Sequence, residues 1–286
     1  MRIRSIASWI LFAGIFFLIG CTGRQGEFTE ESSQLEAGQV DQRSEETAIV
    51  NEPQTIEEWA AEVGAQWDND NQAMTIQRRV PEGRTPVESF EFGSLLKLPD
   101  SELQRIKRWG IVGSQIIDPE TIDFSRFTML ERFGTTSTNL TSIRGIDRAQ
   151  IQAISINDAP LKDISLITNL TQARVISIRS TMLFEVPEDL SGLVAVDELD
   201  LVAPELRSME GIKTIPNPFT MAVVGVVKDG RYQYPDVEVF RSIIGSKAQG
   251  LYMSFETEQM YGLELQQIVE EVRQYNPNFF ISGFGP

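Results

Sequence analysis

The chain has 286 residues, 41% of them hydrophobic, and its 41 acidic residues against 25 basic ones give a net charge of -16. That length allows one large domain or two small ones, and the charge argues against binding to nucleic acid or, through charge, to anionic lipid. There is no histidine and only one cysteine, so the commonest general base is missing and no intrachain disulfide can form.

Residues 1–20 are predicted to be an export signal peptide. Arg2 and Arg4 supply its positive start, and the apolar run that follows is shorter than the roughly 20 residues that span a bilayer. The run ends in LIGC at residues 18–21, which resembles the lipobox of bacterial lipoproteins. The resemblance implies cleavage before Cys21 and attachment of lipid to its sulfur and its amine. The alternative is an uncut signal anchor in which Cys21 is an incidental apolar residue.

A lipid anchor on Cys21 would hold the chain at the bacterial cell envelope, because each buried CH2 group contributes about 0.8 kcal/mol. Thr22 stands where relatives retained in the inner membrane carry aspartate, so the resemblance favours the outer membrane, on its periplasmic or surface side. Residues 21–55 are acidic, rich in Gln, Glu, Ser and Thr, and poor in aromatic residues. We expect them to form a disordered tether, because they cannot bury enough apolar surface to offset the entropy of ordering.

Residues 56–128 are predicted to form a capping region. The expected elements are a helix at 56–69 that carries Trp59, Val63 and Trp67, strands at 74–80 and 90–92, and a helix at 100–109 that turns Leu103, Ile106 and Trp109 inward. A cap is expected because the open end of a repeat array exposes core and unpaired strand edges.

From residue 129 the apolar residues recur with a period near 22. A first coil carries Leu130, Phe133, Leu140, Ile143 and Ile146, and three more coils are expected at 151–172, 173–193 and 196–212. A fixed period of this length is typical of a solenoid with one strand in each coil. The series that keep step are Ile154, Ile176 and Leu199; Ile156, Ile178 and Leu201; Leu161, Leu183 and Leu206; and Ile164, Val186 and Met209.

The segment LKDISLITNLTQARVISI at residues 161–178 resembles the leucine-rich repeat of internalin-type bacterial surface proteins. The resemblance covers about residues 130–213 and implies an α/β fold, a leucine-rich-repeat solenoid with parallel strands. The chain departs from the family at the ladder asparagine, whose amide bonds buried backbone groups. Those positions hold Thr138, Ala159, Thr181 and Pro204 here, and of these only the threonines can replace part of that bonding.

After residue 216 the spacing lengthens. We expect strands at 219–227, 251–255 and 279–282, with helices at 235–244 and 258–275. Strand, helix and strand in this order form parallel crossover units. The solenoid would then occupy residues 129–286, with an outer wall that changes from coil to helix. The alternative is a separate small α/β unit over 216–286, which a hairpin at Asp229-Gly230 would favour.

The strand positions between the inward residues should form a concave face on which polar side chains dominate. The candidate partner-binding residues are Arg132, Asn157, Arg179, Glu198 and Asp200. Solenoids use such extended faces to bind other proteins. The alternative is a solvated surface with weak cross-strand ion pairs.

The sequence gives little support for catalysis. Acid pairs such as Asp197-Glu198 and Glu270-Glu271 could hydrolyse a glycoside, but a chain with 41 acids holds such pairs by chance. It has no calcium-binding loop, nucleophile elbow or phosphate-binding loop. The prediction is therefore a non-enzymatic protein-protein interaction module at the envelope. Its partner would be another protein or an envelope component, with no cofactor, no metal and no nucleic-acid partner. The alternatives are an envelope hydrolase that uses paired carboxylates and a purely structural envelope lipoprotein.

Overall fold

The computed structural model describes residues 53–80, 85–228, 231–253 and 255–283. The predicted signal peptide, the lipidation site Cys21 and nearly all of the tether lie outside these residues. No helix in the described part of the chain is both long enough and apolar enough to cross a membrane.

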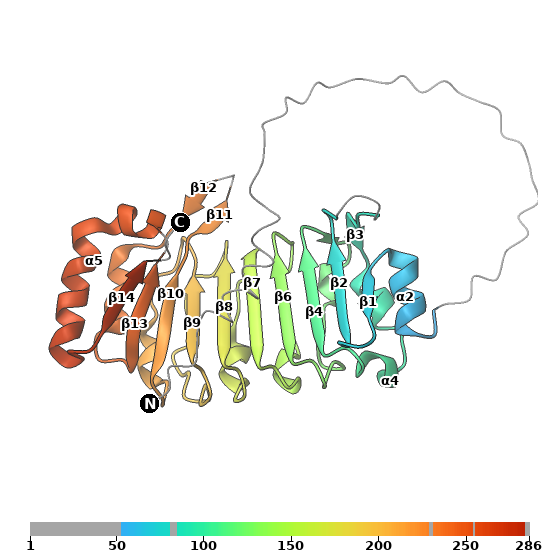
Figure 1. Cartoon of the computed structure of the whole chain (residues 1–286), viewed down its shortest axis with the longest axis horizontal. Helices are drawn as coiled ribbons and strands as arrows, with labels where there is room; N and C mark the ends of the chain where they lie inside the picture. The colour runs from blue at the N-terminus through green and yellow to red at the C-terminus, as the bar shows by residue number, and fades with distance from the viewer. Residues whose placement is uncertain (1–52, 81–84, 229–230, 254, 284–286) are drawn as a thin grey trace, which may run out of the picture. The chain divides into compact units, whose positions relative to one another are not determined.

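One sheet of ten strands organises the fold, and its spatial order follows the order of the chain (Figure 1). The first pair is antiparallel, and every later pair of neighbours is parallel. Each parallel strand therefore needs a return segment before the next one begins. The strands are β1 (Gln66–Asp68), β2 (Ala73–Gln77), β4 (Arg108–Val112), β6 (Arg132–Thr136), β7 (Ala153–Ala159), β8 (Val175–Ser180), β9 (Glu198–Val202), β10 (Phe219–Val223), β13 (Ala248–Met253) and β14 (Phe280–Gly283).

The predicted register of the central strands is confirmed. Ile154 pairs with Ile176, which pairs with Leu199, and all three side chains are fully buried. The second series, Ile156, Ile178 and Leu201, aligns in the same way. Successive side chains of a strand point to opposite faces, so these aligned aliphatic residues form one face of the sheet and pack into a continuous core.

The return segments are mostly short 3-10 helices, which pass behind the sheet. They are η1 (Pro119–Thr121), η2 (Ile146–Arg148), η3 (Ser165–Asn169), η4 (Glu210–Thr214) and η5 (Val237–Ile243). Neighbouring returns touch backbone to backbone at two glycines. A Cβ atom on Gly192 would lie 2.0 Å from the carbonyl oxygen of Thr168, and one on Gly211 would lie 1.8 Å from that of Pro187. Only glycine allows this spacing between the coils.

One hydroxyl group and one amide satisfy backbone groups beside two of the four predicted ladder positions. Ser180 Oγ donates to the carbonyl of Leu161 at 2.5 Å, one residue before the expected Thr181. Asn139 follows Thr138, and its amide accepts from Ile116 N at 2.7 Å and donates to Ile116 O at 2.8 Å. Beside Thr138 and Thr181, therefore, an adjacent side chain bonds backbone groups of the preceding coil.

The amino-terminal elements differ from the expected ones. The first helix, α2, ends at Val63, so Trp67 lies in β1. The helix predicted for 100–109 ends at Leu103 as α4 (Asp100–Leu103), and Trp109 belongs to β4. Phe92 does not extend β3 but begins the short helix α3. The short helices and strands of this region are α2 (Ile56–Val63), β3 (Ser89–Phe90), α3 (Phe92–Leu95) and β5 (Gln115–Ile116), which pairs with β3.

Tertiary packing overrides the helical spacing at Trp109. Its ring lies 5.4 Å from that of Phe92, 5.2 Å from Phe127 and 5.8 Å from Phe133, measured between centroids. Trp109 also pairs with Met74 and Phe133 in the sheet. A helix over this stretch would lose both the ladder hydrogen bonds and the aromatic cluster. The parallel ladder therefore already begins at β2, upstream of residue 129.

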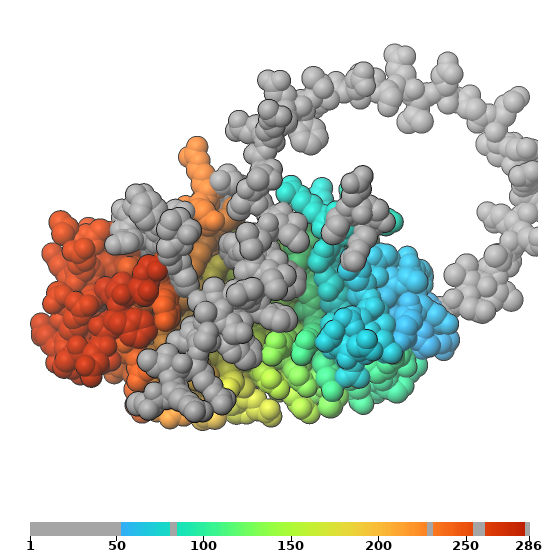
Figure 2. Space-filling view, in the orientation of Figure 1, coloured from blue at the N-terminus to red at the C-terminus, as the bar shows by residue number. Residues whose placement is uncertain are grey.

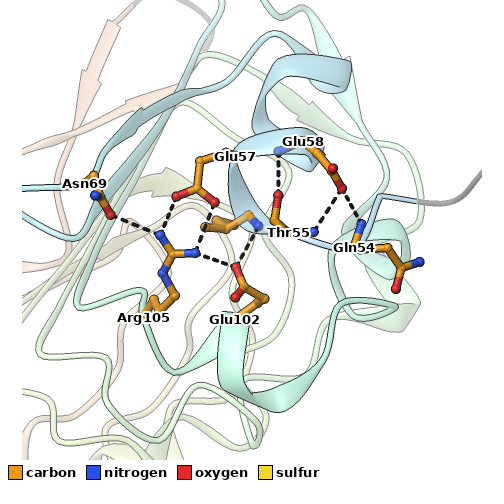
Figure 3. Close-up of polar contacts among 8 residues, drawn as sticks. Gln54, Thr55, Glu57, Glu58, Asn69, Glu102 and Arg105 are labelled. Atoms are coloured by element: carbon orange, nitrogen blue, oxygen red, sulfur yellow. Dashed lines mark hydrogen bonds and ion pairs between the residues drawn. The ribbon is translucent and has the colours of Figure 1, made fainter.

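Arg105 joins the first helix to the rest of the fold (Figure 3). Its guanidinium donates to Glu57 of α2, to Glu102 of α4 at 2.6 Å and to Asn69 at 3.0 Å. It also lies 5.5 Å from the ring centroid of Trp67. The planar guanidinium can serve several acceptors at once, so Arg105 stabilises the packing of α2 beside β1.

The carboxyl-terminal strands continue the same sheet. β10 pairs with β9 and β13, and β13 pairs with β14, all in parallel. The connection from β10 to β13 contains an antiparallel hairpin of β11 (Val226–Lys228) and β12 (Arg231–Gln233), whose turn lies outside the described residues. The predicted helix 235–244 is the 3-10 helix η5. The helix α5 (Phe255–Tyr275) has a non-helical residue, Gly262, within it. Figure 2 shows α5 at the opposite end of the molecule from α2.

Candidate functional site

The side chains that alternate with the core residues form what we call the open face of the sheet. Parallel pairing aligns those of β6 to β9 in three rows. The first row is Arg132, Ala153, Val175 and Glu198; the second is Gly134, Ser155, Ser177 and Asp200; the third is Thr136, Asn157, Arg179 and Val202. Neighbouring strands are about 4.8 Å apart, so side chains on adjacent strands of one row are in reach of each other.

Arg179 and Asp200 form an ion pair on this face. Arg179 Nε donates to Asp200 Oδ2 at 2.6 Å, and Ser177 Oγ donates to the same oxygen at 3.1 Å. The side chain of Asp200 is only 1% exposed and that of Arg179 is 14% exposed. Strand alternation alone predicts that Asp200 faces solvent. The structure instead buries this carboxylate against its two donors.

One oxygen of Asp200 is left without a partner. Asp200 Oδ1 is buried and accepts no hydrogen bond from the described residues. Burial raises the pKa of Asp200, and the charge and the hydrogen bonds of Arg179 and Ser177 act against that rise. An unpaired buried acceptor costs roughly 1–3 kcal/mol, so a donor that reached Oδ1 would be stabilised there.

Glu198 adds a second carboxylate two residues away on the same face. Its side chain is half-buried, and within the described part of the chain it makes no hydrogen bond or ion pair. Burial raises the pKa of Glu198, the charge of Asp200 raises it further, and Arg179 lowers it. The two acids therefore share the single guanidinium of Arg179.

Asp158 is a third acid of the group, and the sequence pattern did not single it out. It is the extra residue of a bulge between β7 and β8 and has a φ of 55°. Its Oδ1 accepts from the backbone N–H of Val227 at 2.8 Å, which fastens the hairpin strand β11 to the end of β7. Burial raises the pKa of Asp158, while the Val227 bond and Arg179 lower it. The only sequence signal was the Asn-Asp pair at a strand end, where left-handed backbone is tolerated.

We call Asp158, Ser177, Arg179, Glu198 and Asp200 the Asp200 site. Asn157 lies beside it in the row of Arg179. Its Nδ2 donates to Ser155 Oγ at 3.2 Å, and its Oδ1 is buried without a partner among the described residues. Four of the five predicted residues, Asn157, Arg179, Glu198 and Asp200, therefore lie on three consecutive strands.

Arg132 lies apart from them. It is in the row of Glu198, but Ala153 and Val175 intervene, so three strand spacings of about 4.8 Å separate the two positions. Arg132 pairs in register with Arg108 of β4. The sequence did not predict this pair, because the spacing of apolar residues around Arg108 predicts a helix and not a strand. Burial lowers the pKa of Arg132, and the like charge of Arg108 lowers it further. The open face is thus basic at β4 and β6 and acidic at β9.

Three acids of the two pairs considered for glycoside hydrolysis form ion pairs with arginine side chains. Asp197 pairs with Arg174 at 3.1 Å. Glu270 pairs with Arg273 at 2.8 Å, and Glu271 pairs with Arg241 at 2.9 Å. No group of three or more acidic or cysteine side chains in the described ranges could hold a metal ion.

Comparison with known proteins gives no family. No protein-family model matches the chain, and no curated protein matches its sequence. Among solved structures, an internalin from Listeria monocytogenes is similar, with 12% sequence identity and a TM-score of 0.35. The alignment covers 66% of this chain and 63% of the internalin chain, so the chain spans less than two thirds of that protein's length. A similarity with so low a TM-score does not establish a shared function.

Proposed function

We propose that this protein is a lipid-anchored bacterial envelope protein whose folded part, a leucine-rich-repeat-type solenoid, binds another protein through the open face. Binding is non-covalent and needs no cofactor. The observation that carries the proposal is the alignment of mostly polar residues in rows across β6 to β9, on strands whose other face is fixed in the core. Side chains held on such a rigid support lose little entropy when a partner binds.

The two ends of the open face differ in charge, and this difference supports a protein partner. Arg108 and Arg132 lie on β4 and β6, and the half-buried Glu198 lies on β9, beside the buried ion pair of Asp200 and Arg179. A surface with both signs in fixed places selects a partner by complementary charge and fixes its orientation. A uniformly acidic face, which the net charge of the chain would suggest, offers no such selection.

Site-specific photocrosslinking in the native envelope tests the proposed face. A photoreactive residue at Asn157 is expected to form a distinct adduct with one protein. The same residue at Ser165, which is exposed on the return segment η3, is the matched control and should not form it. An adduct that forms equally from both positions would contradict the open face as the binding surface.

The membrane anchor is tested separately. Incorporation of a labelled fatty acid is expected in the natural chain and not in Cys21→Ser. If Thr22 directs the protein to the outer membrane, Thr22→Asp should move it to the inner-membrane fraction, and Thr22→Ser should leave it in place. Equal labelling of Cys21→Ser and the natural chain would refute lipidation at this residue.

A further inference from the structure

The Asp200 site carries more negative than positive charge in a buried setting. The guanidinium of Arg179 pairs with Asp200, and its charge also lowers the pKa of two further carboxylates, those of Asp158 and Glu198. Lys162 is exposed and Arg174 pairs with Asp197, and neither makes a hydrogen bond to these acids among the described residues. Buried charge without compensation is costly, so such a cluster favours the arrival of a cation.

The orphaned oxygen gives an independent reason to expect a ligand. Asp200 Oδ1 is buried and unpaired, whereas Oδ2 already accepts from both Arg179 and Ser177. The site therefore has one vacant acceptor on a fully buried carboxylate, with the unbonded carboxylate of Glu198 on the same face of the same strand. Positions i and i+2 of a strand are about 7 Å apart, so one small donor can lie between the two acids.

We propose that the Asp200 site receives the ammonium group of a lysine side chain that the partner protein presents. This proposal depends on the proposed function, because it assumes that the open face binds a protein. The ammonium donates one N–H to Asp200 Oδ1 and another to the carboxylate of Glu198. Its charge offsets the excess of carboxylates that Arg179 leaves unbalanced.

The geometry selects lysine over arginine. A guanidinium binds best when two parallel N–H groups meet both oxygens of one carboxylate. A second guanidinium cannot bind both oxygens of Asp200, because Oδ2 already accepts hydrogen bonds from Arg179 and Ser177. An ammonium is a compact charge with three donors, and it can use single oxygens on two different carboxylates. The lysine would enter beside Glu198, which is half-buried and held by no bond among the described residues, and its entry must displace the side chains that cover Asp200 Oδ1.

The test uses the full chain purified in detergent and short peptides that carry one central residue between glycines. The amide NMR signals of Ser177 and Asp200 are followed while peptides with lysine, acetyl-lysine or arginine are added. The lysine peptide is expected to cause a saturable shift and the acetyl-lysine peptide none. The arginine peptide is expected to bind at least several-fold more weakly.

Two variants of equal charge separate the site from the general acidity of the chain. Asp200→Asn should weaken binding of the lysine peptide about tenfold or more, which corresponds to about 1.4 kcal/mol. Asp197→Asn removes the same charge from a nearby residue, which is 64% exposed and pairs with Arg174, and should change binding less than twofold. Glu198→Gln is the second variant if Asp200→Asn fails to fold, and it should also weaken binding.

Three results would overturn the proposal. The first is the absence of a saturable shift with the lysine peptide, and the second is equal binding by Asp200→Asn and Asp197→Asn. The third is binding of free butylammonium as tight as that of the peptide, which would assign the site to a small amine. If the peptides fail while Asn157 still crosslinks to a protein, the lysine site is wrong and the binding face stands. If both fail, the proposed function is wrong.

Discussion

Replacing Gly211 by alanine tests how closely the coils stack. A Cβ atom at this position would lie 1.8 Å from the carbonyl oxygen of Pro187 and 2.9 Å from its carbonyl carbon. Real Cβ atoms essentially never approach closer than 3.0 Å, so the added methyl group intrudes by about 1.2 Å. The obstacle is backbone of the preceding coil, which cannot rotate away as a side chain can.

The expected loss in free energy of unfolding is large for a single methyl group. Overpacking of a tight interior costs about 1–3 kcal/mol when side chains can yield. Here two neighbouring coils must separate, and residues of both, such as Leu190 and Ile212, are buried in the shared core. We therefore expect a loss of about 3 kcal/mol or more, a large part of the roughly 5–15 kcal/mol that stabilises a typical folded protein.

Urea unfolding followed by circular dichroism measures this loss, with Gly134→Ala as the matched control. Gly134 lies on the open face of β6, and a Cβ atom there would come no closer than 3.8 Å to the carbonyl oxygen of Ser155. Both variants reduce the entropy of the unfolded chain equally, so the control should be neutral or more stable by up to about 1 kcal/mol. Equal unfolding midpoints for the two variants would refute the tight stacking of the return segments.

The remaining predictions concern single side chains. Ile176→Ala should lower the free energy of unfolding by about 2–5 kcal/mol in a denaturant titration, because Ile176 is fully buried between Ile154 and Leu199; a loss below about 1 kcal/mol would contradict the continuous core. Asp118 accepts hydrogen bonds from the backbone N–H groups of Phe92 and Gly93 and from the Thr121 hydroxyl. Burial raises its pKa, but these bonds lower it more, so the net pKa lies below the usual 3.8. Asp118→Asn should therefore cost about 1.5–3 kcal/mol at pH 7, and the difference from the natural chain should shrink as the pH falls below about 4 in unfolding measured across pH; a difference that does not depend on pH would refute the role of the charge. Burial and Asp200 raise the pKa of Glu198 in the folded state, so its ionisation makes folding less favourable as the pH rises through that pKa. Glu198→Gln should thus be more stable than the natural chain at pH 7 by thermal unfolding, with an advantage that fades toward pH 4.5, and a variant less stable at pH 7 would contradict this assignment.

The stacking of the central strands could be predicted from the sequence because the signal is repeated. Ile154, Ile176 and Leu199 recur at the spacing of the coil, and a parallel ladder can satisfy that spacing in one register only. Each series supports the others, so substitution of the ladder asparagine did not hide the pattern. Ser180 and Asn139, which bond backbone groups of the preceding coil, lie beside the positions expected for that asparagine, and only the tertiary structure identifies them.

Local spacing was misleading where long-range packing decides the structure. Trp67 and Trp109 fit helices by their spacing, but both lie in strands. A strand at Trp109 brings its ring against Phe92 and Phe133, which are 17 and 24 residues away in the chain. The error at Trp109 also hid Arg108, the partner of Arg132 in the sheet.

The sequence by itself determined which residues face the core, and hence which share the opposite face of the sheet, because strand alternation and the repeat period are local properties. Only the tertiary structure decided which charged side chains on that face are buried and which groups they bond. The bond from Arg179 to the buried Asp200 joins residues 21 apart in the chain, and the bond from Val227 to Asp158 joins residues 69 apart. The unpaired oxygen of Asp200 likewise results from the packing around it. Such bonds depend on which coils become neighbours and on where the hairpin folds back, and no short-range pattern in the chain encodes either.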